Sequence, residues 1–387
     1  MRVAVVHNLS RGGAWRRLSE QARALDAEVV EVCLSSAVSV ADRGVKVPLR
    51  ALASAAPRAA RPPLRYADVL LLRHAWRRAA RAVRDVRPDV VLANPCQILQ
   101  GPAGIAWTGV PTLYFCDEPR RADYEDPDGA RRNPRTRRLY APLHDAERRL
   151  DRLAALSADR LVTNSRYTAA TIEAAYGRPA DVVALGVPDA FLAPRPADAA
   201  HRPGHVLSVG TLIPTKGHDL AIAAVARAAT RRPLIVVAGH GEDTERRRLL
   251  ALAREHGIGL DLRIGISDAE LRDLYAGAHA LLYLSAREPL GLASLEAQAS
   301  GTPVVVADDG GIPETIIPGE TGFAVARDAA AAAAALDRLD DPDLRARMGA
   351  AAAAHGATYT WARSAAELRA LLEAVAAAGA TPGRARG

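Results

Sequence analysis

Residues 206–224 read VLSVGTLIPTKGHDLAIAA. A short apolar run that ends in glycine predicts a buried strand followed by a turn. A helix is expected to begin near Asp219, whose side chain is a natural N-cap. The same order opens the chain, where VAVVH at 3–7 precedes SRGGA at 10–14 and then a helical stretch. This repeated order of strand, turn and helix predicts two similar α/β halves.

Further β-rich runs recur between helical stretches that are rich in alanine, arginine and leucine. They occupy residues 90–93, 112–116 and 160–164 in the first half, and 234–239, 280–285 and 303–307 in the second. Strands that alternate with helices predict parallel sheets covered by helices on both faces. We therefore expect an α/β fold with two doubly wound domains, whose ligands bind at the carboxyl ends of the strands.

Changes of composition indicate where the domains end. We expect an N-terminal domain at residues 1–195 and a second domain at 196–360, joined by a linker rich in proline and alanine at 186–204. Residues 361–378 have the pattern of an amphipathic helix, which we expect to return to the N-terminal domain. The final residues, 379–387, have no apolar pattern and are expected to form a loose tail.

The basic residues are unevenly distributed along the 387 residues, whose net charge is +7. Residues 1–195 hold 31 Lys and Arg against 21 Asp and Glu, whereas residues 196–387 hold 20 against 23. A basic half can attract nucleic acid, an anionic membrane or an anionic acceptor, or it can be an arginine-rich surface without a partner. The basic stretch 73–88 contains few aromatic residues and no recognisable nucleic-acid-binding module, so we expect no nucleic acid partner.

The cysteines and the apolar segments help to predict the cellular compartment of the protein. Cys33, Cys96 and Cys116 are odd in number and lie in apolar runs, which favours reduced buried thiols over disulfides. The first residues contain too short an apolar run for a signal peptide, and the alanine tract 329–336 is too short to cross a bilayer. We therefore expect a cytoplasmic protein.

The segment SAREPLGLASLEAQASGTPVVVADDGGIPE at 285–314 follows a predicted strand directly. Gly291 permits a tight turn, and a helix that begins near it would present unpaired N–H groups to a diphosphate. Glu296 would lie on the order of 7 Å along that helix, a suitable place for a carboxylate that accepts hydrogen bonds from a ribose. Taken in isolation, Glu296 is more simply interpreted as an exposed helix residue. Glu288 precedes the helix, on the opposite side of the phosphates, where a sugar would lie.

Lysine is rare in this chain. Of the 51 basic residues only Lys46 and Lys216 are lysine, so a position that keeps lysine can require a compact ammonium rather than a guanidinium. Chance is the alternative explanation, and only the position of each lysine can decide.

At these residues the chain resembles glycosyltransferase family 4, whose members are retaining transferases with the two-domain GT-B fold. The resemblance rests on the E-x7-E signature within EPLGLASLEAQASGTPVV at 288–305. It covers most of the chain and is weakest at residues 35–85. The other similar segments are 11–14, 114–119, 163–172, 209–224, 239–243, 264–285 and 310–325.

The resemblance implies a role for each candidate residue. Lys216 would bind the donor diphosphate, Glu288 would hydrogen-bond the donor sugar, and Glu296 would hold the ribose. The remaining donor-binding candidates are the backbone of Leu290, Gly291 and Leu292 at the phosphates, Ile264, Gly265 and Ile266 against the base, and Gly12 and Gly13 in the glycine loop that faces the donor.

Two positions depart from the family pattern. Thr211 stands where family members often have an arginine, so one phosphate-binding cation is missing unless Arg287 or another arginine compensates. Asp117 stands at or near the place of a histidine beside the transferred sugar. Asp117 or Glu118 could orient an acceptor hydroxyl, or either could cap a turn before Pro119.

The resemblance further implies transfer of a hexosyl sugar from a UDP- or GDP-type donor, with retention and without a metal or another cofactor. The acceptor could be a glycan, a lipid or a small molecule. The arginine-rich stretches 73–87 and 131–138 could hold the protein on the inner face of an anionic membrane, or they could be ordinary solvated helix faces.

A nucleotide-sugar epimerase or a phosphorylase on the same fold remains the alternative function. A nicotinamide oxidoreductase is disfavoured because no G-x-G-x-x-G follows residues 3–7.

Overall fold

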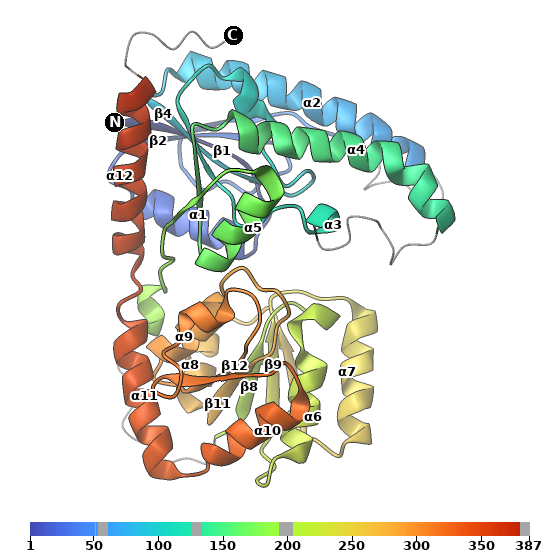
Figure 1. Ribbon diagram of the computed structural model, residues 1–387, viewed down its shortest axis with the longest axis vertical. Helices are drawn as coiled ribbons and strands as arrows, with labels where there is room; N and C mark the ends of the chain where they lie inside the picture. The colour runs from blue at the N-terminus through green and yellow to red at the C-terminus, as the bar shows by residue number, and fades with distance from the viewer. Residues whose placement is uncertain (51, 53–60, 125–133, 193–203, 380–387) are drawn as a thin grey trace. The chain divides into compact units, whose positions relative to one another are not determined.

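The computed structural model describes residues 1–50, 52, 61–124, 134–192 and 204–379. Within these ranges the chain forms two compact units (Figure 1). Unit 1 comprises Met1–Asn164, Thr168–Val183 and the chain from Ala362 onward, and unit 2 comprises Ser165–Tyr167 and Ala184–Trp361. Residues 193–203 of the predicted linker and residues 380–387 of the predicted tail lie outside the described residues.

Unit 1 contains a seven-stranded sheet in the order β3-β2-β1-β4-β5-β6-β7, in which every neighbouring pair is parallel. Its strands are β1 (Arg2–Asn8), β2 (Glu28–Leu34), β3 (Gly44–Val47), β4 (Val90–Cys96), β5 (Thr112–Phe115), β6 (Arg160–Thr163) and β7 (Asp181–Val182). Its helices are α1 (Gly13–Ala24), α2 (Arg61–Val86), α3 (Arg121–Tyr124), α4 (Pro134–Ser157), most of α5 (Arg166–Tyr176) and nearly all of α12 (Trp361–Gly379).

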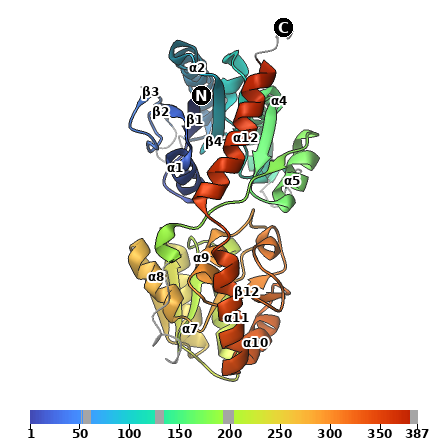
Figure 2. The same cartoon turned by 90° about the vertical axis from the view of Figure 1, so that its left-hand side faces the viewer.

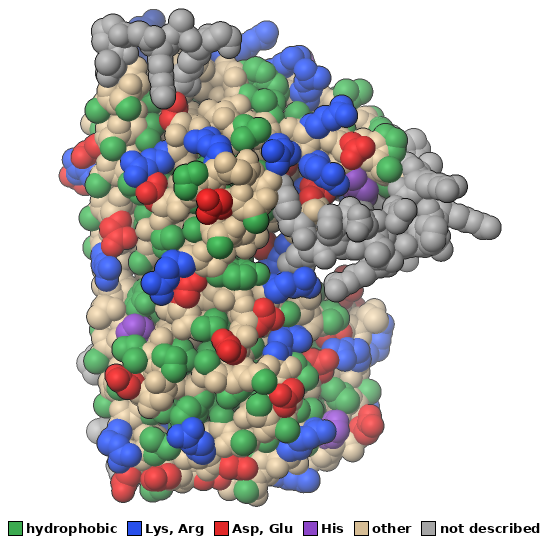
Figure 3. Space-filling model, viewed as in Figure 1, with side chains coloured by type: hydrophobic (Ala, Val, Ile, Leu, Met, Phe, Trp, Pro, Cys, Tyr) green, Lys and Arg blue, Asp and Glu red, His purple; other side chains and the backbone are tan. Residues whose placement is uncertain are grey.

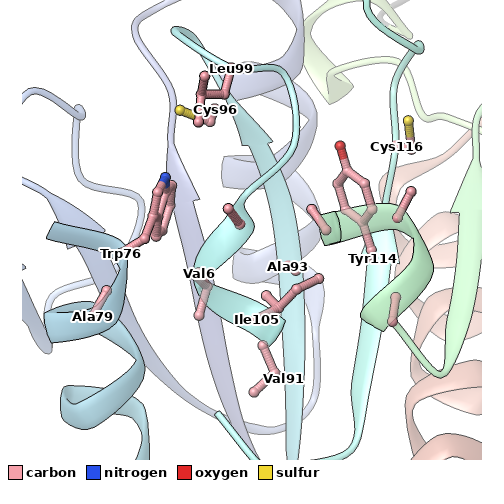
Figure 4. Close-up of a cluster of buried hydrophobic side chains, with 14 of the residues drawn as sticks. Val6, Trp76, Ala79, Val91, Ala93, Cys96, Leu99, Ile105, Tyr114 and Cys116 are labelled. Carbon is pink, nitrogen blue, oxygen red and sulfur yellow. The ribbon is translucent and has the colours of Figure 1, made fainter. Parts of the chain in front are cut away.

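The core of unit 1 lies between this sheet and the helices α2, α4 and α5. Trp76 of α2 and Tyr114 of β5 are its largest fully buried side chains (Figure 4). Cys33, Cys96 and Cys116 are buried free thiols, which confirms the prediction of reduced cysteines.

The helix α12 returns to unit 1, in agreement with the amphipathic pattern of its sequence. Gln21 of α1 donates a hydrogen bond from Nε2 to Oγ of Ser364 at 3.0 Å, and this bond is buried. Figure 2 shows α12 running alongside the sheet of this unit.

Unit 2 contains a six-stranded parallel sheet in the order β10-β9-β8-β11-β12-β13. Its strands are β8 (Val206–Val209), β9 (Leu234–Ala238), β10 (Leu260–Ile264), β11 (Ala280–Tyr283), β12 (Val304–Ala307) and β13 (Gly322–Val325). Its helices are α6 (His218–Arg227), α7 (Asp243–Glu255), α8 (Asp268–Gly277), α9 (Leu292–Ala299), α10 (Ala329–Arg338) and α11 (Pro342–Gly356). Both sheets are parallel and flanked by helices, so the predicted α/β class is confirmed.

No helix in the described parts of the chain combines the length and the apolar character needed to cross a membrane.

Candidate active site

The candidate active site lies at the carboxyl end of the sheet of unit 2, where β8 and β11 are neighbours. After β8 the chain proceeds to β9 on one side of the sheet, and after β11 it proceeds to β12 on the other side. The loops that follow β8 and β11 therefore diverge at a topological switch point, the position at which open α/β sheets bind ligands.

These two loops are held together by backbone contacts. Gly217 has a φ of 71°, and a Cβ added to it would lie 2.2 Å from the carbonyl oxygen of Leu284. The N–H of Ala286 donates to the carbonyl of Thr215 at 2.8 Å. The left-handed backbone and the close approach both require glycine at position 217, which fixes the loop of Lys216 against the end of β11.

Lys216 and Glu288 are brought together across these loops. The Nζ atom of Lys216 lies 2.6 Å from Oε2 of Glu288, and both side chains are less than one-fifth exposed. Ser285 donates from Oγ to the same carboxylate oxygen at 2.8 Å. The sequence analysis placed Lys216 and Glu288 in one donor site without pairing them, and the structure joins them in an ion pair.

The helix α9 begins at Leu292, directly after Gly291 and near the predicted start. Gly291 is its N-cap with a φ of 105°, and it makes no side-chain cap hydrogen bond. The backbone of Leu290, Gly291 and Leu292 thus leads into a helix start whose N–H groups no capping side chain covers, which is a suitable arrangement for an anion.

Glu296 is buried on α9, with only 5% of its surface exposed. The hydroxyl of Tyr275 donates to its Oε2 atom at 3.1 Å. The alternative that Glu296 is an exposed helix residue is therefore wrong. A buried carboxylate requires hydrogen-bond donors, and Tyr275 supplies one from within the protein.

His218 is a residue of this site that the sequence analysis did not identify. Its imidazole is 1% exposed, with Nδ1 at 2.9 Å from Oγ of Ser208 and Nε2 at 3.3 Å from the carbonyl oxygen of Gly210. Burial lowers the pKa of His218 to about 4, so the ring is neutral at physiological pH. Its position directly after the Lys-Gly turn, in a helix start with buried neighbours, was the available signal.

The predicted capping role of Asp219 is wrong. The helix α6 begins one residue earlier, at His218, with Gly217 as its N-cap. Asp219 instead lies in the first turn, where its Oδ2 atom is 3.3 Å from Arg248. The left-handed conformation of Gly217 starts the helix without a capping side chain.

The other predicted residues of unit 2 lie at the same carboxyl end of the sheet. Thr211 is half-buried in the loop that follows β8, and Ile264 ends β10 with 46% of its surface exposed. Gly265 has a φ of 69° and turns the chain before Ile266. Arg287 has a φ of 47°, an unusual backbone conformation for a residue with a side chain.

Gly12 and Gly13 lie in unit 1, where they start α1 after β1. A Cβ added to either glycine would meet no atom within 4 Å. The packing of the chain therefore does not itself require glycine here, and the surface above them is open to the close approach of another molecule.

Asp117 lies at the end of β5 in unit 1 and is held by a buried arginine. Arg17, which is fully buried, donates from Nε to Oδ1 and from a terminal nitrogen to Oδ2 of Asp117, both at 2.8 Å. Its guanidinium lies over the ring of Phe115, with 3.8 Å between the charge centre and the ring centroid. Arg17 was missed because a basic residue in an arginine-rich sequence gives no signal of burial.

In the described residues, one group of three histidine, cysteine and carboxylate side chains lies close enough to share a metal ion, and it consists of His7, Glu31 and Cys33. The Nδ1 atom of His7 accepts from the N–H of Leu9 at 3.2 Å, which assigns the ring proton to Nε2, 2.7 Å from Oε1 of Glu31. A metal at Nε2 would move that proton to Nδ1, against the N–H of Leu9. This cluster therefore fits a hydrogen-bonded buried pair better than a metal site.

Two family profiles match consecutive parts of the chain. The profile described as Glycosyltransferase Family 4 matches residues 11–191, and the one described as Glycosyl transferases group 1 matches residues 193–355.

Curated relatives include a D-inositol 3-phosphate glycosyltransferase of Acidothermus cellulolyticus, 35% identical over 53% of this chain and 51% of the relative. A protein of the same name from Streptomyces scabiei is 38% identical over 54% of this chain and 52% of the relative. The matches thus span about half the length of these relatives.

Solved structures with the same architecture include a sucrose-phosphate synthase of Thermosynechococcus elongatus, with a TM-score of 0.72 at 21% identity over 97% of this chain and 99% of that one. Anabaena HepE in complex with UDP has a TM-score of 0.70 at 17% identity, over 97% of this chain and 100% of that one. At such identities the likeness concerns the fold alone, which is GT-B.

Proposed function

Because the chain belongs to glycosyltransferase family 4, we propose that it moves a hexosyl sugar from a nucleotide-diphosphate donor to an acceptor hydroxyl, with retention at the anomeric carbon. The supporting observation is the placement of Lys216 at the switch point of unit 2, beside Glu288, which shortly precedes the start of α9, where no side chain caps the helix. A cation and a helix start at one sheet edge form a site for a diphosphate.

In this mechanism the chain stabilises the leaving group. Lys216 and the first N–H groups of α9 bind the departing diphosphate, while Glu296 accepts hydrogen bonds from the ribose. Glu288 positions the sugar. The base lies against Ile264, Gly265 and Ile266 at the end of β10.

The chemical step breaks the bond between the anomeric carbon and the phosphate oxygen and joins the acceptor oxygen to that carbon on the same face. A phosphate oxygen of the leaving group takes the acceptor proton, so no side-chain base and no metal is required. The contribution of the protein is mainly positioning and charge stabilisation. Asp117, whose carboxylate Arg17 fixes in place, is proposed to orient the acceptor.

The names of the relatives suggest substrates to test. The curated relatives are named for D-inositol 3-phosphate, and HepE binds UDP and glucose in its solved complexes. For this chain we propose a UDP- or GDP-type donor and an acceptor that is a glycan, a lipid or a small molecule. D-inositol 3-phosphate is the first acceptor to assay.

A thermal-shift panel of UDP, GDP, ADP and their sugars, measured in buffer with EDTA, tests the proposal. We expect at least one nucleotide to raise the melting temperature, because a ligand that binds only the folded state stabilises it. The shift should persist in EDTA. Stabilisation by none of the ligands would refute the donor site, and a shift that appears only with added manganese would refute metal independence.

The exposed side of α2 supports a peripheral contact with an anionic membrane as part of this proposal. Leu70 is 68% exposed, Tyr66 lies one turn before it, and Arg73 and Arg77 follow on the same side of the helix. Figure 3 shows basic and hydrophobic side chains together over this part of unit 1. Apolar residues beside arginines suit the boundary between headgroups and acyl chains. The predicted stretch 131–138 has no described side chains.

Flotation with vesicles of anionic phospholipid tests this contact. We expect the protein to float with the vesicles at moderate salt and the Leu70→Glu variant to lose most of the binding, because a carboxylate at the apolar tip is repelled by the headgroups. Ile317→Glu changes a 40% exposed residue of unit 2 in the same way and should float like the wild type. Equal flotation of both variants, or no binding by the wild type, would contradict the proposal.

A further inference from the structure

A charged group and a polar group converge on one carboxylate oxygen of Glu288. Its Oε2 atom lies 2.6 Å from Nζ of Lys216 and accepts from Oγ of Ser285 at 2.8 Å. The stem of Lys216 lies against Gly210, where a Cβ would approach its Cγ and Cδ atoms to 3.3 Å. The ammonium is thus directed to Glu288 from a tightly packed stem.

The backbone of Glu288 is fixed as firmly as its carboxylate. The N–H of Gly311 donates to the carbonyl of Glu288 at 2.8 Å. A Cβ at Gly310 would lie 2.6 Å from the same carbonyl oxygen, and one at Gly311 would lie 2.1 Å from the carbonyl oxygen of Pro289. Because the backbone is held at this close contact, only rotation of the side chain can move the carboxylate away from Lys216.

A diphosphate bound by Lys216 would bring a second group of negative charge to the same ammonium. Glu288 would then be a like charge within a few ångströms of the phosphates, at a site that is more than four-fifths shielded from solvent. Like charges at such a distance repel appreciably when water does not screen them. A sugar on the diphosphate can compensate for this repulsion, because its hydroxyls can donate hydrogen bonds to the carboxylate. A free nucleoside diphosphate has no sugar to do so.

From this geometry we infer that Glu288 competes with the diphosphate for Lys216 and thereby weakens the binding of the nucleoside diphosphate product relative to the sugar donor. This inference rests on the proposed function. It assigns Glu288 a role in product release in addition to the positioning of the sugar. The carboxylate of Glu288 thus favours binding of the sugar donor over binding of the nucleoside diphosphate product.

The Glu288→Gln variant tests the inference, since glutamine keeps the shape and the hydrogen bond from Ser285 but has no charge. UDP, GDP and ADP are titrated separately into both proteins by calorimetry. We expect the nucleotide that binds the wild type to bind the variant with a dissociation constant on the order of tenfold lower. Product inhibition should become stronger by the same factor, while the rate of sugar transfer falls.

The matched control is Glu320→Gln, which removes one negative charge from an exposed position of unit 2 and should leave the dissociation constant unchanged. Equal or weaker binding of the nucleotide by Glu288→Gln, in a variant whose melting temperature without nucleotide matches the wild type, would overturn the inference alone. Failure of the wild type to bind any of the three nucleotides would overturn the proposed function and the inference with it.

Discussion

Lys216→Ala should abolish the thermal shift that a nucleoside diphosphate gives the wild-type protein and slow sugar transfer about 10²–10³-fold. The magnitude is that found when one charge-stabilising donor is removed from a preorganised site. Lys216 lies at the switch point between β8 and β11, in a loop that Gly217 fixes against Leu284. Thr211 supplies no charge where family members often have an arginine, so the loss of Lys216 leaves this loop without a cation.

The second lysine of the chain provides the control. Lys46 is exposed on β3 in unit 1, and Lys46→Ala removes the same charge from a position that the donor site does not use. The melting temperature of the unliganded Lys216→Ala protein should stay near that of the wild type, because Ser285 still donates to Glu288. A nucleotide shift of wild-type size in Lys216→Ala would show that Lys216 does not bind the diphosphate.

The strands that could be predicted from the sequence are the ones buried on both faces. All eight predicted runs are strands, and those at 90–93 and 303–307 are continuous apolar segments that helices cover on both sides. The strands β2, β3, β7, β10 and β13 were not predicted. All but β2 lie at sheet edges, where segments such as GVKV and LDLRI mix charged with apolar residues, and β2 itself carries two glutamates in EVVEVCL. Edge strands are half-solvated, so their composition approaches that of a loop.

The site was predictable where glycine and helix starts determine it. Gly291 directly precedes α9, near the predicted start, and its φ of 105° disfavours any residue with a side chain. The pairing of Lys216 with Glu288 was not predictable, because it depends on how two loops 72 positions apart meet. The ion pair between Arg17 and Asp117 was not predictable either, because these residues are 100 positions apart and only the folding of unit 1 brings them together. Contacts between such distant positions cannot be predicted from the spacing of residues in the sequence.

Asp151→Asn should stabilise unit 1 above pH 7 and have little effect near pH 4. Asp151 is fully buried on α4, where Oδ2 accepts from the hydroxyl of Tyr176 at 2.9 Å. Burial raises the pKa of Asp151 from 3.8 to about 7. Between these values the folded protein holds a proton that the unfolded chain has lost, so the free energy of unfolding falls as the pH rises through this window. A shift of this size corresponds to at most roughly 4 kcal/mol.

Urea unfolding of both proteins, followed by tryptophan fluorescence at pH 4, 6 and 8, measures the difference. The increase of this difference in unfolding free energy with pH reports on Asp151 alone, because the other titrating groups are common to the two proteins. Asp145→Asn, at an exposed position of the same helix, should show no such trend. If Asp151→Asn were instead less stable than the wild type at pH 8, the ionised carboxylate would have to be stabilised inside unit 1. The hydroxyl of Tyr176 and the charge of Arg120 would then account for it, since both already lower the pKa of Asp151 against the effect of burial.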